Sequence, residues 1–136
     1  MVISNYYQER KLYDKEIDIT QLFYNYDSVY HVVGIDSSQK TNLLNNLAYG
    51  YLFNGETGKS KYYYTKAGIL DYYYYNVACI KSLDKKTNEA LENLEQSFQN
   101  GYKNYDHIQV DTDLDNIRNT DEFKQLLRKY FPGKVK

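Results

Sequence analysis

The scarcity of helix-breaking residues constrains this chain more than any other feature. Pro132 is the single proline among the 136 residues, and seven glycines supply the remaining punctuation. Proline removes a backbone donor and clashes inside a helix, so its absence before position 132 leaves nearly the whole chain open to helix formation. The length suits one domain with a real core. We therefore predict an all-α domain.

Four stretches carry the apolar spacing of amphipathic helices, in which residues at i, i+3, i+4 and i+7 share one face. The first covers 41–54, and Asp71 precedes the third. Glycines at 55, 68 and 101 stand where helices would end. The residues expected to face inward are, helix by helix, Leu44, Leu47, Ala48 and Tyr51; Ser60, Tyr64 and Ala67; Tyr74, Val77, Ala78 and Lys81; and Ala90, Leu91, Leu94 and Phe98.

The four helices are two copies of one unit. A shift of 30 residues, from 46 to 76, places Leu47-Ala48 on Val77-Ala78 and Ser60 on Ala90. Small residues at matched positions would let paired helices approach closely. A helix pair cannot bury its apolar face alone, so such units are expected to stack.

The first copy resembles a tetratricopeptide repeat, and the second is similar to it. The second copy departs from the family pattern at Lys81, where an aromatic residue is usual, and at Lys85, where glycine is usual. The spacing is also shorter than the usual period of about 34 residues, so we expect a tight turn between the copies. The matching residues are Leu47, Ala48, Tyr51, Gly55, Ser60, Tyr64 and Ala67, then Val77, Ala78, Ala90, Leu91 and Leu94.

Residues 101–127 resemble the end segment that closes many bacterial tetratricopeptide arrays. The resemblance rests on Gly101, Asp111, Asp113, Leu114, Asp115, Ile117, Arg118, Phe123, Leu126 and Leu127. Its apolar members are expected to cover the last helix pair, and Asp121 is expected to cap a helix. The resemblance implies a solenoid of antiparallel helix pairs, with two hairpins in 41–100 and an end segment in 101–136. Residues 1–40 are predicted to be helical and packed on the repeats.

The resemblance also implies a partner-binding surface, because the first helix of each tetratricopeptide pair lines a concave face that holds peptides. The residues placed there are Asn42, Asn45, Tyr49 and Leu52 from the first copy, and Tyr72, Tyr75, Cys79 and Ser82 from the second. Amide and phenol groups can bind an extended backbone, and exposed tyrosine is typical of protein interfaces. The alternative is that further helices, or residues 1–40, cover this surface.

Two motif fragments have competing interpretations. Gly58-Lys59-Ser60 ends like a phosphate-binding loop, but the pattern needs glycine at Phe53 and a preceding strand, so a turn between helices explains it better. Asp111, Asp113, Asp115 and Glu122 have the spacing of a calcium loop. Asn116 stands where that loop needs glycine, so at most weak calcium binding is expected.

The composition excludes several classes of function. The net charge is −1, from 17 basic and 18 acidic residues, which argues against a nucleic-acid partner. No apolar run is long enough to cross a membrane, and the N-terminal residues lack the apolar core of a secretory signal, so we expect a cytoplasmic protein. His31, His107 and the single Cys79 form no sequence cluster typical of a metal site or a nucleophile.

The sequence therefore predicts a non-catalytic protein-binding module or scaffold, without metal or cofactor, that binds a protein or peptide partner. Two alternatives stay open: a small inhibitor or immunity-type protein that neutralises one partner, and a helical module for a small ligand. An exposed tyrosine surface could also pair with itself in a homodimer.

Overall fold

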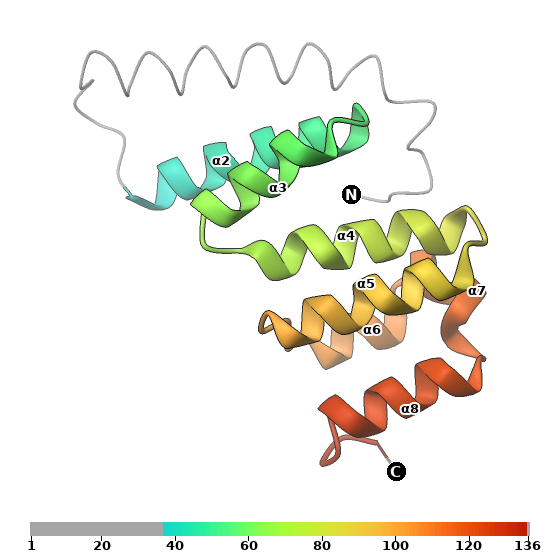
Figure 1. Cartoon of the computed structure of the whole chain (residues 1–136). Coiled ribbons are helices and arrows are strands. Elements are labelled where there is room, and N and C mark those ends of the chain that lie inside the picture. The colour runs from blue at the N-terminus through green and yellow to red at the C-terminus, as the bar shows by residue number, and fades with distance from the viewer. Residues whose placement is uncertain (1–36, 136) are drawn as a thin grey trace, which may run out of the picture. The chain divides into compact units, whose positions relative to one another are not determined.

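The computed structural model describes residues 37–135, and all the regular structure in this range is helical (Figure 1). The all-α prediction is thus confirmed for this part of the chain. Of the segment 1–40, which was predicted to be helical and packed on the repeats, residues 1–36 lie outside the described part. The elements are α2 (Ser37–Phe53), α3 (Thr57–Lys66), α4 (Leu70–Leu83), α5 (Thr87–Gln99), α6 (Tyr105–Val110), the 3₁₀ helix η2 (Thr112–Leu114), α7 (Asp115–Arg118) and α8 (Asp121–Tyr130).

The described residues divide into two compact units, 37–70 and 71–135. The first unit is the hairpin of α2 and α3. Close approach of these helices depends on two small residues: the Ser60 hydroxyl donates to the Ala48 carbonyl oxygen at 2.7 Å, and both residues are fully buried. Beside this contact, the Tyr51 ring stacks on Tyr63 with their centroids 5.6 Å apart. The small side chains predicted to bring the helices together therefore lie at the contact.

Four helices end in the same way, with one residue in the left-handed conformation. Gly55, Gly68 and Gly101 have positive φ, as their place after a helix predicts, and Lys85 has a φ of 60°. At each end the next residue's amide reaches back into the last turn of the helix; after Lys85, the Lys86 amide donates to the Lys81 carbonyl oxygen at 2.9 Å. Lys85 thus adopts the conformation that its glycine counterpart in the first copy, Gly55, adopts more easily.

The two hairpins that the sequence matches differ in the length of their second helix. Helices α3 and α5 begin at matched positions, Thr57 and Thr87, but α3 has 10 residues and α5 has 13. Three residues are slightly less than one helical turn. The chain between α3 and α4 is 67–69. Helix α3 is therefore nearly one turn shorter than its counterpart α5.

The second unit contains α4 to α8. Helices α4 and α5 run antiparallel (Figure 1), and the ion pair between Lys81 and Glu89 links them at 3.7 Å. The apolar residues predicted to cover the last helix pair are buried, except that Leu126 is half-buried. They are Leu114, Ile117, Phe123 and Leu127. The segment after α5 thus shares one core with the helix before it.

Two predictions about this unit are wrong in detail. The fully buried face of α4 consists of Tyr75, Ala78, Cys79 and Ser82, whereas Tyr74, Val77 and Lys81 are half-buried. The true buried face is therefore turned by one residue from the predicted one. Helix α8 is capped by Thr120, whose hydroxyl accepts from the Phe123 amide at 3.2 Å, and Asp121 is the first helical residue. Within residues 37–135, no helix has the length and apolar character needed to span a membrane.

Candidate functional site

The residues predicted to bind a partner differ widely in exposure. In the first unit Asn42 is exposed, Asn45 and Tyr49 are half-buried, and Leu52 is buried. In the second unit only Tyr72 is exposed, at 46%, while Tyr75, Cys79 and Ser82 are 3% exposed or less. These last three therefore have little surface with which to contact a partner. Their burial agrees with the alternative that other parts of the chain cover this surface. Tyr72 is therefore the α4 member best placed to meet one.

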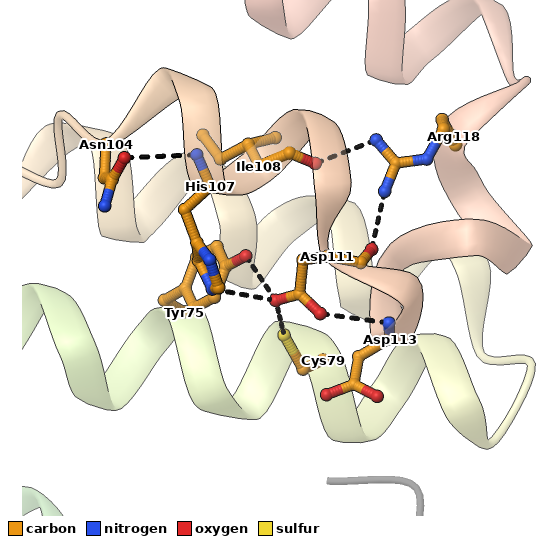
Figure 2. A network of polar contacts seen from close by, with 8 residues as sticks. All are labelled: Tyr75, Cys79, Asn104, His107, Ile108, Asp111, Asp113 and Arg118. Carbon is orange, nitrogen blue, oxygen red and sulfur yellow. Dashed lines mark hydrogen bonds and ion pairs between the residues drawn. The ribbon is translucent and has the colours of Figure 1, made fainter. Parts of the chain in front are cut away.

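Tyr75 and Cys79 face a carboxylate from the C-terminal segment (Figure 2). The Tyr75 hydroxyl donates to Asp111 Oδ2 at 2.6 Å, and the Cys79 thiol lies 3.7 Å from the same oxygen. His107 Nε2 approaches that oxygen to 3.3 Å. The Tyr75 ring stacks on Tyr102 with the centroids 4.3 Å apart and the planes nearly parallel. These contacts join α4 to residues more than twenty positions later in the chain, and they account for its buried face.

The Asp111 carboxylate is held in place by its own segment. Its second oxygen, Oδ1, accepts from the Asp113 amide at 3.0 Å and so caps η2. The Arg118 guanidinium donates to the backbone oxygens of Asp111 and of Ile108, the latter at 2.8 Å (Figure 2). Asn104 caps α6 by accepting from the His107 amide. Caps and one arginine thus fix the segment that passes over α4.

The electrostatics of this cluster keep Tyr75 and Cys79 neutral. Burial is the main cause that raises the pKa of the Tyr75 hydroxyl, and the negative charge on Asp111 adds to it. Burial likewise raises the pKa of the Cys79 thiol well above its ordinary value, with Asp111 and Asp113 reinforcing the shift. Cys79 therefore stays a thiol at neutral pH. A protonated, buried thiol is a weak nucleophile, so the cluster is suited to stabilise the fold.

Three residues of this cluster have side chains that can bind a metal. One ligand atom from each of Cys79, Asp111 and Asp113 lies within 4.8 Å of the others. A metal would need Cys79 as a thiolate, but the raised pKa opposes its ionisation, and Asp111 Oδ2 already accepts from Tyr75. This donor set fits a hydrogen-bonded cluster better than a metal site.

Of the four residues with calcium-loop spacing, Asp111 and Asp113 lie close together, but Asp115 and Glu122 do not join them. Asp111 caps η2, and Asp115 instead accepts from Arg118 at 3.2 Å. Glu122 lines a groove between α5 and α8. The Gly58-Lys59-Ser60 stretch opens α3, and Ser60 turns its hydroxyl toward α2. Both placements favour the structural interpretations of these motifs.

Two tyrosines stand out among the described residues because their rings are exposed and held. Tyr72 meets the buried Tyr102 edge-on, with the centroids 5.8 Å apart. Tyr62, 59% exposed, meets Tyr63 edge-on at 5.1 Å. A ring fixed by a neighbour loses less conformational freedom when a partner covers it. Only Tyr72 belongs to the surface predicted from the sequence.

The sequence did not predict the contacts that Asp111 and Tyr102 make with α4. Asp111 was matched as a position in the end segment and in a calcium-loop spacing, and neither match predicts its contact with Tyr75, 36 positions away. Tyr102 follows Gly101, where an apolar residue often packs back on the preceding helix, so its burial had a sequence signal but its stacking on Tyr75 of α4 did not.

Comparisons with known proteins found one partial similarity. No family model matches it, and no solved structure matches it. A stretch of 56 residues, 41% of the chain, is 34% identical to a protein of Arabidopsis thaliana whose name describes it as chloroplastic. That stretch spans 17% of the plant protein's length. The likeness is partial and shows no family for this chain.

Proposed function

We propose that this chain is a non-catalytic helical module, of the tetratricopeptide-like kind, that binds a protein or peptide partner. The proposal rests on the exposure of Tyr72. It is a large aromatic residue from the predicted surface, it is 46% exposed, and Tyr102 holds its ring. Exposed tyrosines of this kind supply much of the binding energy at protein interfaces.

The polar cluster beneath Tyr72 supports a binding function over a catalytic one. The neighbouring Tyr75 hydroxyl and Cys79 thiol are both neutral donors to Asp111, and both are buried. A catalytic nucleophile would instead need a lowered pKa and access to a substrate. The cluster links α4 to the segment after α5. These links hold in place the part of α4 that carries Tyr72.

Site-directed photocrosslinking tests this surface. Benzoylphenylalanine replaces Tyr72 in one variant and Tyr62 in a second, and each purified protein is irradiated in a lysate of the source cells. Tyr62 is a matched control because it is also an exposed tyrosine held edge-on by a neighbour, but it lies outside the predicted surface. We expect one main adduct from position 72 and none from position 62.

Two controls decide what an adduct means. Excess wild-type protein should prevent formation of the adduct. The isolated partner should then bind Tyr72→Ala with an affinity at least roughly tenfold lower than for the wild type, as for an interface residue that contributes over about 1.4 kcal/mol. Equal adducts at both positions, or unchanged affinity of Tyr72→Ala, would remove this surface from the proposal. Absence of any adduct at position 72 would count against partner binding there altogether.

A further inference from the structure

A groove separates α5 from α8 on the second unit. The two helices run in the same direction (Figure 1), and the groove between them has a volume of about 430 Å³. That volume lies within the range of roughly 300–1,000 Å³ found for ligand pockets in proteins. The residues that line it are Asn88, Leu91, Glu92, Glu95, Glu122, Gln125, Leu126 and Lys129.

One end of the groove is closed by contacts between the two helices. Lys129 Nζ lies 2.8 Å from Glu95 Oε1, and the Tyr130 hydroxyl donates to the same oxygen at 2.9 Å. Just beyond, the Phe98 ring meets Tyr130 and Phe131 with centroids 5.3 and 5.2 Å away. These contacts link the C-terminal halves of α5 and α8, and the groove lies beside them.

The open part of the groove combines an apolar floor with a negative rim. Leu126 is the one apolar residue predicted to cover the last helix pair that stays half-buried, and Leu91 lies with it in the groove. Glu92 and Glu122 are exposed on the two helices. The third carboxylate, Glu95, is matched by Lys129, which also lowers its pKa. The groove therefore keeps an excess of two negative charges, one from each helix.

We propose that this groove binds a basic, amphipathic peptide segment of a partner protein. Apolar side chains of that segment pack on Leu91 and Leu126, and its lysine or arginine side chains pair with Glu92 and Glu122. Charge complementarity selects this occupant, because an acidic segment would meet two uncompensated carboxylates. The surface differs from the one around Tyr72, so the chain has room for two contacts with one partner or for two partners.

A peptide titration followed by NMR tests the proposal on the full chain. The probe is a short amphipathic peptide of lysine and leucine, and the control peptide has glutamate in place of lysine. We expect the lysine peptide to shift amide signals of α5 and α8 around 88–92 and 122–126. The Glu92→Gln/Glu122→Gln variant should bind it roughly five- to tenfold more weakly, and salt should weaken binding of the wild type more than of the variant.

Asp84→Asn/Asp106→Asn is the matched control, because it removes two acidic charges from exposed positions outside the groove. It should bind the lysine peptide as the wild type does. Equal weakening in both double variants would mean that only net charge matters, and would overturn the proposal. So would binding of the glutamate peptide, signal shifts centred elsewhere, or no binding of the lysine peptide. A circular dichroism spectrum confirms that each variant keeps its helices.

Discussion

Lys85 is the residue at which the second copy of the repeat strains its own backbone. Its φ of 60° lies in the left-handed region, where a Cβ atom crowds the following carbonyl oxygen. Glycine has no Cβ and adopts this conformation freely. We expect Lys85→Gly to raise the free energy of unfolding by about 1 kcal/mol, measured by urea denaturation at unchanged m-value.

Lys86 provides the control for this substitution. Its φ is −91°, a conformation that lysine adopts without strain, so glycine there adds only flexibility to the unfolded chain. Lys86→Gly should leave stability unchanged or lower it by up to about 1 kcal/mol. If the two substitutions changed the free energy of unfolding equally, the left-handed conformation would not strain Lys85.

At the scale of single elements, α8 depends on a cap that the sequence-based prediction placed one residue too late, at Asp121. Thr120 and Asp121 are adjacent residues that both cap helices well, and only the extended backbone of Thr120 settles the choice. Its hydroxyl also donates to the Ile117 carbonyl oxygen at 2.7 Å, so it joins the end of α7 to the start of α8. We expect Thr120→Ala to lower the free energy of unfolding by about 1 kcal/mol, measured by thermal or urea denaturation.

Two further variants separate the cap from other effects at this position. Thr120→Ser keeps the oxygen that accepts from the Phe123 amide, so it should retain most of the stability. Asp121→Ala removes a favourable charge near the helix N-terminus, and its smaller expected loss is about 0.5 kcal/mol. A larger loss from Asp121→Ala than from Thr120→Ala would show that Asp121 is the working cap in solution.

The helices themselves followed well from sequence, but the orientation of α4 did not. Glycines at 55, 68 and 101 fixed helix ends through local backbone chemistry, which short-range sequence reports directly. The inward face of a helix depends instead on its neighbours in space. Tyr75 and Cys79 turn inward because Tyr102 and Asp111 meet them from beyond α5. Apolar spacing alone cannot reveal a face completed by a distant carboxylate.

The candidate binding site was predictable to the same limited degree. Tyr72 was identified from its place in the repeat, and its exposure keeps it a candidate. Its neighbours around the helix, Tyr75 and Cys79, were identified in the same way but are buried. The groove between α5 and α8 had no sequence signature, because Leu91 and Leu126 looked like ordinary core residues. A surface formed by two segments emerges only when both are placed.

At the scale of the whole molecule, the cluster around Asp111 makes stability depend on alkaline pH. In the unfolded chain tyrosine ionises near pH 10 and cysteine near pH 8.5. The folded chain raises the pKa of both Tyr75 and Cys79, so it favours their neutral forms. Their contribution is fully present below the unfolded values and is lost as pH rises above them. We therefore expect the free energy of unfolding to fall from about pH 8.5 upward.

Tyr75→Phe measures how much of this loss of stability at alkaline pH is due to the Tyr75 hydroxyl. At pH 7 the variant should be less stable by about 1.5–3 kcal/mol, because it loses a buried hydrogen bond to a carboxylate. Above about pH 10 its stability should fall less steeply than that of the wild type, by up to about 1.4 kcal/mol per pH unit, since it has no phenol to ionise at this position. Urea denaturation at a series of pH values measures both effects.

Tyr62→Phe is the control, because it removes the hydroxyl of an exposed tyrosine in the other unit. Its pH profile should follow that of the wild type. Parallel profiles for Tyr75→Phe and the wild type above pH 10 would show that the Tyr75 phenol does not resist ionisation in the fold. A flatter profile in Tyr75→Phe alone would link the stability of the whole second unit to the one carboxylate that joins α4 to the segment after α5.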